Sequence, residues 1–259
     1  MLLDPNQISK REKLILTGLY LSKFDLLGLA KLGFDSFIEG TNVVGYALGS
    51  KPASIKNYRD EFDPLFPNPR QGWHKRPRRE YCLKIYEEYH SLDLDTFASL
   101  IKSFVGCEDK NWNATDEDQT KLESESAFAK RLITGLAAEN YFDSIRHKLP
   151  EFQGFAAENT TRLGCGFDFR LSKTERKDFY AVEVKGLTER AGNVLLTRKE
   201  YEVADKLTEN YFLFVVKNFR DSPTHMIYRN PLSSGLLFTQ KKRTVVQEYW
   251  QTSISSTPD

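Results

Sequence analysis

The sequence predicts a chain of two units: an all-α N-terminal unit over about residues 1–106 and an α/β C-terminal unit with a mixed sheet over about 126–259. Apolar residues recur at helical spacing through the first unit, whereas strand-like apolar runs alternate with helical stretches in the second. Between them, residues 107–125 are acidic and poor in core residues, which is typical of a linker. A length of 259 residues accommodates two modest domains.

Composition and charge limit the classes of function. The chain is 40% hydrophobic and 13% aromatic, enough for buried cores, and its formal net charge is only +1, so a nucleic-acid surface must come from local segregation of charge. Three cysteines without a Cys-x-x-Cys pair, no secretory leader and no bilayer-length apolar run predict a cytoplasmic protein that does not enter membranes. The four histidines show no metal-ligand spacing with the cysteines, and no phosphate-binding glycine loop suggests ATP hydrolysis.

Residues 10–40 and 80–106 are predicted to be helical because their apolar side chains recur at intervals of three and four. Gly33 is the expected stop signal at the end of the first segment. We expect the apolar side chains of that segment to pack inside a helical domain. They are Leu16, Tyr20, Phe24 and Leu27, with Leu29 and Leu32 continuing the series.

Residues 41–59 have the layout helix, turn, helix. A short helix over 41–49 is closed by glycine, a turn covers 51–54, and Ser54 is the expected cap of the second helix. Two interpretations stay open: a helix-turn-helix DNA-binding motif, and an ordinary helical hairpin with a solvated polar face. In the first interpretation, the residues that face DNA are Ser54, Lys56, Asn57 and Arg59.

Residues 64–84 form a basic loop in which prolines at positions 64, 67, 69 and 77 forbid a continuous helix. Six Lys or Arg side chains outnumber the single acidic Glu80, and aromatic residues lie among them, which suits phosphate contact and base stacking. A charge run is usually a solvated surface, but its place beside the candidate helix-turn-helix favours DNA contact. The proposed contacts are Arg70, Trp73, Lys75, Arg76, Arg78 and Arg79.

From residue 126 the pattern becomes α/β. A helical apolar stripe opens the unit, and apparent strands then follow with one further helix among them. Thr197 and Glu200 fit a capping box at the start of that further helix. This order requires crossovers within one sheet, so a mixed sheet is expected. The predicted strands cover 165–171, 178–185, 193–196, 211–216 and 226–228, and the helix covers about 198–208.

Asp168, Glu183 and Lys185 are the strongest candidates for chemistry. On a strand, Glu183 and Lys185 point to one face while Val182 and Val184 point to the other. Inward-facing charges are costly unless compensated, and a divalent metal held by the two carboxylates would compensate them, with the ammonium beside a bound water. The alternatives are an internal salt bridge and a turn aspartate bonded to its own backbone. Because buried ion pairs stabilise a fold poorly, we favour function.

Four sequence pieces, in this order, resemble one domain family. The set is similar to the C-terminal domain of protein NO VEIN, also found in bacterial defence and restriction proteins. Its Asp…Glu-x-Lys core resembles that of the restriction-endonuclease-like, or PD-(D/E)XK, nucleases, and the resemblance covers roughly residues 125–235. The pieces are Gly135-Leu-Ala-Ala-Glu139, Gly166-Phe-Asp168, Val182-Glu-Val-Lys-Gly186 and Leu196-Thr-Arg-Lys-Glu200-Tyr, with Ala204 downstream.

The resemblance implies a restriction-endonuclease-like fold and magnesium-dependent cleavage of phosphodiester bonds. Asp168 and Glu183 are then the expected metal ligands, manganese is an expected substitute for magnesium, and the backbone carbonyl of Val184 is a further candidate ligand. Lys185 would position the attacking water or offset charge in the transition state. Glu139 matches an extra acidic residue near the metal, with an exposed helix glutamate as the equal alternative.

We therefore expect a magnesium-dependent DNA endonuclease of the restriction or phage-defence type, whose N-terminal unit recognises double-stranded DNA. The resemblance also implies a homodimer, because double-strand cleavage by one-site nucleases of this fold usually needs two copies. A companion methyltransferase is a candidate partner. Two alternatives stay open: a non-catalytic DNA-binding or targeting module, and a nuclease directed at RNA or single strands.

Overall fold

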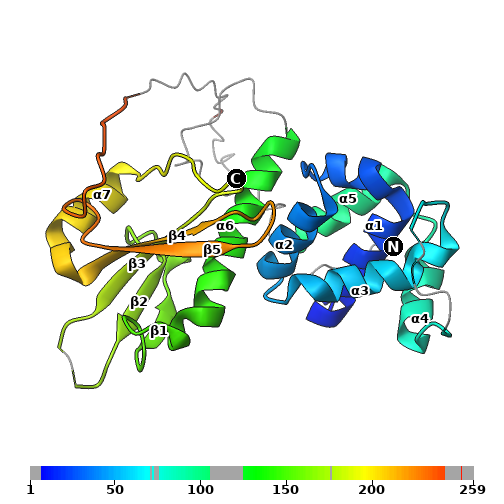
Figure 1. The fold of residues 1–259 in the computed structure, drawn as a ribbon, viewed down its shortest axis with the longest axis horizontal. Helices are drawn as coiled ribbons and strands as arrows, with labels where there is room; N and C mark the ends of the chain where they lie inside the picture. Colours follow the sequence, from blue (N-terminus) through cyan, green and yellow to red (C-terminus); the bar gives the residue numbers. More distant parts are fainter. Residues whose placement is uncertain are drawn as a thin grey trace, which may run out of the picture.

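The computed structural model describes residues 7–70, 72, 76–105, 125–175, 177–242 and 252. Over these residues the chain forms a helical N-terminal unit and a C-terminal unit built on a five-stranded sheet, which lie side by side (Figure 1). The predicted acidic linker lies outside the described residues except for its last position, which begins the first helix of the second unit. None of the described helices is long and apolar enough to cross a membrane.

Over its described residues, the helical unit contains five α-helices, in agreement with the helical periodicity of the sequence. The first helix begins at a capping box formed by Ser9 and Glu12 and ends just before Gly33, whose φ of +85° stops it as expected. It packs on the third helix so closely that a Cβ on Gly18 would lie 2.5 Å from the Cβ of Tyr58. The helices are α1 (Lys10–Lys31), α2 (Phe37–Ala47), α3 (Pro52–Phe62), α4 (Glu80–Tyr89) and α5 (Leu94–Ser103).

The helix boundaries around the α2–α3 turn differ from those expected. Helix α2 begins four residues earlier than predicted because Ser36 caps it, accepting a hydrogen bond from the Glu39 backbone N–H. Helix α3 begins at Pro52, with Lys51 at the cap position and no side-chain cap, so Ser54 is not the cap. Proline suits the first helical position because its missing N–H would be unpaired there anyway.

The C-terminal unit confirms the predicted mixed sheet. Among the strands that the structure describes, the order is β1-β2-β3-β4-β5, and only β3 and β4 run parallel, joined through α7. Gly164, just before the expected 165–171 strand, and Gly166 inside it both take positive φ, so the strand begins only after Asp168. The elements are α6 (Glu125–Ile145), β1 (Ala156–Asn159), β2 (Phe169–Ser172), β3 (Tyr180–Gly186), α7 (Arg198–Leu207), β4 (Tyr211–Lys217) and β5 (Thr224–Arg229).

One predicted strand is wrong and one strand was missed. Residues 193–196 form no strand and instead lead into α7, whereas β1 lies at the edge of the sheet over a sequence that reads as polar. β1 is only four residues long and mostly exposed, so it lacks the alternating apolar signal of a half-buried strand. The order of helix, three strands, helix and strand still holds, because β1 replaces the wrongly predicted strand.

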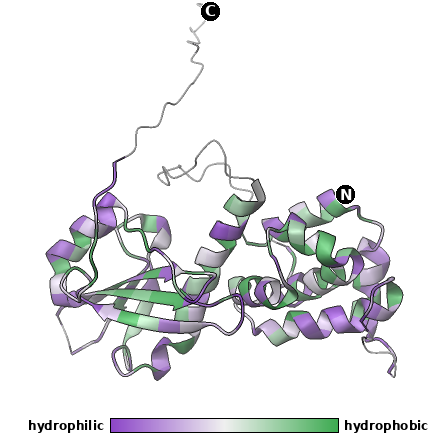
Figure 2. Cartoon of the chain, turned by 45° about the horizontal axis from the view of Figure 1, so that its top comes forward, coloured by the Kyte–Doolittle hydropathy of each residue, from purple (hydrophilic) through white to green (hydrophobic). Residues whose placement is uncertain are grey.

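The sheet has one apolar face against α6 and another that carries the charged residues. Phe142 of α6 packs on Phe169 and Phe214, with ring centroids 5.0 and 4.9 Å apart. The hydropathy colouring shows the apolar strands in the middle of this unit (Figure 2). At the end of β3, a Cβ on Gly186 would lie 2.8 Å from the Thr134 carbonyl oxygen, so glycine allows α6 to approach the sheet there.

Helices α2 and α6 join the two units. Asn42 of α2 donates hydrogen bonds to the carbonyl oxygens of Phe219 and Asp221, at 2.9 and 2.8 Å, in the turn between β4 and β5. The Tyr46 ring packs on Tyr141 of α6 with centroids 5.2 Å apart. Buried apolar residues from both units belong to one continuous cluster. The helical unit is therefore held against the sheet by specific buried contacts.

The Asn42→Ala variant should lose about 1–3 kcal/mol of unfolding free energy, because two carbonyl oxygens lose their donor at a site where Asn42 is only 7% exposed. Urea denaturation measures the change. The matched control is Asn57→Ala, an exposed position on α3, which should alter stability by no more than about 0.5 kcal/mol. Equal effects of the two substitutions would show that the interface contacts contribute nothing specific.

Candidate active site

The register of β2 and β3 brings Asp168 opposite Glu183. Phe169 pairs with Val182 in this antiparallel ladder, and the Asp168 N–H donates to the Val182 carbonyl at 3.0 Å, which extends the pairing by one residue. Because side chains alternate along β3, Glu183 and Lys185 share the face away from the core occupied by Val182. The three residues proposed from the sequence therefore lie together at the edge between core and solvent.

Lys185 forms ion pairs with two carboxylates. Its Nζ lies 2.6 Å from Glu183 Oε1 and 3.0 Å from Glu200 Oε2. Glu183 is only 3% exposed, whereas Lys185 is half-buried and reaches the border of the site. Glu200 also forms the predicted capping box with Thr197 at the start of α7. The sequence predicted that box but gave no sign of the contact with Lys185, which depends on how α7 packs.

Glu139 joins the site through Thr161. The Thr161 hydroxyl lies 3.1 Å from Glu139 Oε2 and 3.4 Å from Asp168 Oδ1, while Asp168 Oδ2 accepts the Val184 N–H at 2.8 Å. Sequence reasoning missed Thr161. The only pattern that included it, Asn159-Thr-Thr, matches a glycosylation signal and has no link to this chemistry. A metal contact by the Val184 carbonyl stays a prediction.

Burial and mutual repulsion raise the pKa values of three acidic groups of the site. Burial, followed by the charge of Asp168, raises the pKa of Glu139 from 4.5 to about 7. Burial likewise raises the pKa of Asp168 to about 6, even though the Val184 N–H and Lys185 oppose the change. The pKa of Glu183 is also well above its ordinary value, owing to burial and then to Asp168. Burial alone would lower the pKa of Lys185, but Glu183 and Glu200 outweigh it and raise that pKa.

The donor set fits a magnesium-like cation. Four carboxylates (Glu139, Asp168, Glu183 and Glu200) surround a single ammonium, so the site has an excess of negative charge when they are ionised. Within the described residues, no three His, Cys, Asp or Glu side chains form a group that could hold an ion by themselves. Magnesium keeps several waters and needs only one or two protein carboxylates, so Asp168 and Glu183 are a sufficient pair.

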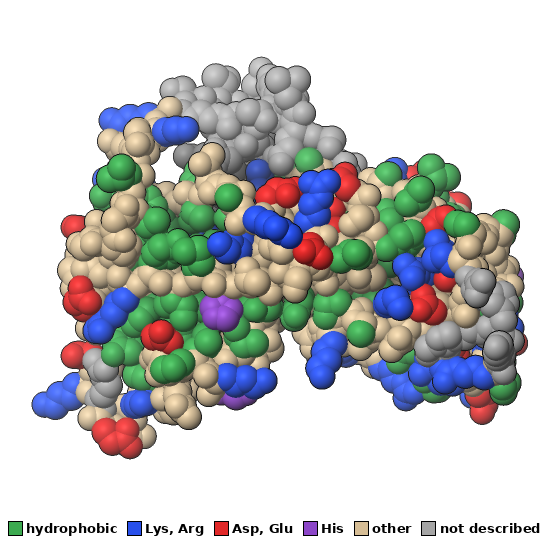
Figure 3. Space-filling view, viewed as in Figure 1, with side chains coloured by type: hydrophobic (Ala, Val, Ile, Leu, Met, Phe, Trp, Pro, Cys, Tyr) green, Lys and Arg blue, Asp and Glu red, His purple; other side chains and the backbone are tan. Residues whose placement is uncertain are grey.

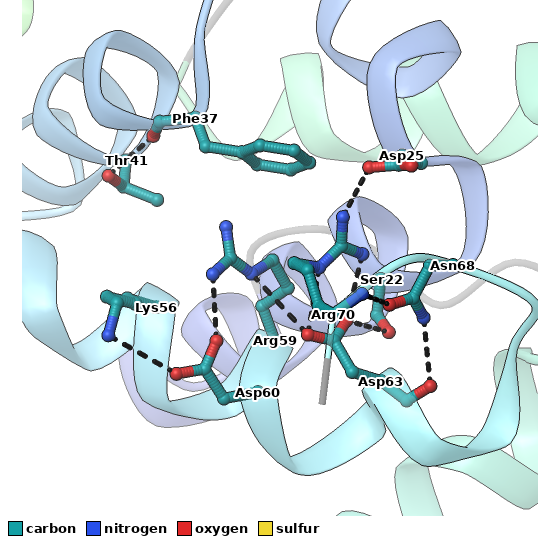
Figure 4. A network of polar contacts seen from close by, with 10 residues as sticks. All are labelled: Ser22, Asp25, Phe37, Thr41, Lys56, Arg59, Asp60, Asp63, Asn68 and Arg70. Carbon is teal, nitrogen blue, oxygen red and sulfur yellow. Dashed lines mark hydrogen bonds and ion pairs between the residues drawn. The ribbon is translucent and has the colours of Figure 1, made fainter. Parts of the chain in front are cut away.

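The structure corrects the proposed DNA contacts of Arg59 and Arg70, which belong to an internal ion-pair network (Figure 4). Asp63, with a fully buried side chain, accepts from Arg70 Nε and Nη2, both at 2.9 Å, and from Ser22 at 2.8 Å. Arg59 is 7% exposed and lies 2.8 Å from Asp60. Buried charges need such partners, so these two arginines stabilise the helical unit. The expectation that they face the solvent is wrong.

Arg79 is also paired internally, since its guanidinium forms a forked contact with the buried Glu61. Lys56, Asn57 and Arg76 are exposed, and Ser54 and Arg78 are half-buried, so these five candidates stay on or near the surface. Trp73 and Lys75 lie outside the described residues. Lys and Arg side chains gather along the lower edge of the helical unit in Figure 3.

The fold and the site together define a protein in which a helical unit packs against a mixed-sheet domain that carries a buried acidic cluster around one lysine. Residues 138–228 of that domain match the family model described as "Protein NO VEIN, C-terminal". The matched span contains Glu139, Thr161, Asp168, Glu183, Lys185 and Glu200. Neither the curated proteins nor the solved structures contain a significant match to the chain.

Proposed function

We propose that the C-terminal unit is a magnesium-dependent nuclease that hydrolyses phosphodiester bonds of DNA, with the restriction-endonuclease-like arrangement implied by its sequence. The observation that supports this proposal most is the convergence of Glu139, Asp168, Glu183 and Lys185 at the border of the core. An acidic cluster with raised pKa values is costly to the fold, and such cost is typical of functional sites.

In the proposed reaction, a water oxygen forms a bond to phosphorus and gives one proton to the Glu139 carboxylate, while the bond to the leaving ester oxygen breaks and that oxygen takes a proton from solvent. Asp168 and Glu183 would hold magnesium, which supplies Lewis-acid stabilisation of the phosphate oxygens and a more acidic bound water. Lys185 presents a fixed ammonium that orients the water and offsets negative charge on the phosphate oxygens. Glu139, linked to Asp168 through the Thr161 hydroxyl, is the candidate group for proton transfer in this site.

Recognition of double-stranded DNA is assigned to the helical unit. Two 11-residue helices, α2 and α3, flank a short turn in which Gly49 takes a φ of +60°, a layout that supports a helix-turn-helix motif. Lys56 and Asn57 lie on the exposed side of α3, and Arg76 is exposed in the basic loop. Helix α2 lies next to α3 in the proposed motif and also packs on α6, the helix that carries Glu139. It therefore connects the proposed recognition surface to the proposed catalytic site. A restriction or defence role, as a homodimer working alongside a methyltransferase, is part of the same proposal.

The test is cleavage of supercoiled plasmid and of phage DNA with and without base modifications. We expect linear or shorter products with Mg²⁺ or Mn²⁺, none with EDTA, and a preference for duplex over single-stranded DNA or RNA. End mapping identifies the cut. A folded protein that cuts no duplex with either metal contradicts the proposal, and preferential cutting of RNA or single strands would instead support the alternative substrate class.

A non-catalytic DNA-binding module is the second candidate. One observation favours it: Lys185 is already held by two carboxylates, as in a closed structural network. The two candidates differ in metal binding. Under the nuclease proposal, Mg²⁺ should raise the melting temperature of the wild-type chain in the absence of DNA, whereas a structural network predicts no change.

A further inference from the structure

Lys185 is held by two carboxylates that lie on different elements. Glu183 lies two residues away on β3, whereas Glu200 reaches the same ammonium from α7. The side chains of Lys185 and Glu200 are 24% and 15% exposed, so neither is a freely solvated surface group, and their contact is little screened by water.

The first anchor and the proposed metal compete for the same carboxylate. If Glu183 alone held Lys185, a cation bound by Glu183 would repel the ammonium and weaken its only contact. Glu200 lies outside the proposed pair of metal ligands, so it can hold the ammonium whatever Glu183 binds. We propose that Glu200 is the positioning residue for Lys185, keeping its ammonium beside the site when Glu183 serves the metal. The inference rests on the proposed nuclease function.

The local structure of α7 makes Glu200 a firm anchor. The Glu200 carboxylate accepts the Thr197 backbone N–H at 2.9 Å, and the Glu200 N–H donates to the Thr197 hydroxyl at 3.3 Å. The same helix buries Ala204 against the sheet, with Ala181 and Tyr211 in the same cluster. A side chain locked by its own cap on a packed helix holds a partner better than one on a loop. The Thr197 backbone N–H therefore fixes the Glu200 carboxylate, whereas the Thr197 hydroxyl caps the helix start.

The test uses Glu200→Gln, because glutamine can still close the capping box but carries no charge to hold Lys185. The matched control is Glu202→Gln, the same change on the exposed side of α7, where Glu202 pairs with Arg198. A second control, Thr197→Ala, removes the cap hydroxyl and leaves the Glu200 carboxylate. Two quantities are measured on each protein: steady-state plasmid cleavage with Mg²⁺, and Mn²⁺ affinity by calorimetry without DNA.

We expect Glu200→Gln to lower kcat by about 10- to 100-fold with KM for DNA nearly unchanged. Mn²⁺ affinity should also fall, by about 10-fold, because the released ammonium turns wholly to Glu183 and competes with the cation. Glu202→Gln should change neither, and Thr197→Ala should lower the melting temperature but keep kcat. If Glu200→Gln matches Glu202→Gln in both measurements, the positioning role is refuted while the nuclease proposal stands. A wild-type chain that neither cleaves DNA nor binds Mn²⁺ refutes both.

Discussion

Asp168→Asn is expected to lower Mg²⁺-dependent DNA cleavage by at least about 10³-fold while leaving the chain folded. Asparagine has nearly the same shape, and its carbonyl oxygen can still accept the Val184 N–H that Asp168 accepts at 2.8 Å. What it lacks is the negative charge that a metal ligand must supply. Single-turnover cleavage of plasmid DNA measures the rate, and circular dichroism with thermal melting checks the fold.

Asp178→Asn is the matched control for this loss, because Asp178 is exposed just before β3 and lies outside the acidic cluster. Its cleavage rate should equal that of the wild type. Lys185→Met is a second, independent test of the site. Methionine keeps the approximate length of the side chain but lacks the ammonium, so the variant should lose activity to a similar extent. Persistent cleavage by either Asp168→Asn or Lys185→Met would move the catalytic site elsewhere in the protein.

The parts of the site carried by one strand were predictable from the sequence. On β3 the period of two is a local property of the backbone, so the shared face of Glu183 and Lys185 follows from their spacing alone. The mixed sheet was also predictable, because apolar strands such as β4 are long and uninterrupted. The position of Asp168 does not follow from strand period alone, because it depends on the turn made by Gly164 and Gly166. The two glycines themselves indicate that turn in the sequence.

The parts that depend on packing between distant segments were not predictable. Thr161 and Glu200 reach the site only because the segment after β1 and the start of α7 meet β3, and nothing in their local sequence encodes those meetings. Likewise, Arg59 and Arg70 read as surface cations because the positions of Asp60 and Asp63 relative to them depend on the folded α3 and its following loop. Charge in a sequence indicates a possible surface; only the fold indicates which charges are already paired.

Replacing Glu139 with glutamine is expected to stabilise the metal-free protein at high pH, a result opposite to that of most substitutions of a contact residue. The pKa of Glu139 in the folded chain is about 7, raised from 4.5 by burial and by Asp168. The folded state therefore binds the proton more tightly than the unfolded chain, so ionisation costs stability. That cost is absent below about pH 4.5 and complete above about pH 7, where it amounts to roughly 3 kcal/mol.

Glu139→Gln removes that cost while its amide can still bond to the Thr161 hydroxyl. In EDTA, urea denaturation should show a gain of about 1–3 kcal/mol at pH 8 that disappears at pH 4. Glu158→Gln, an exposed glutamate on β1, is the control and should differ from the wild type by less than about 0.5 kcal/mol at either pH. A gain independent of pH, or a loss at pH 8, would mean that Glu139 is not held in a strained ionised state. The expected pattern would instead show that the fold bears a cost at this position, and such a cost favours a functional cluster.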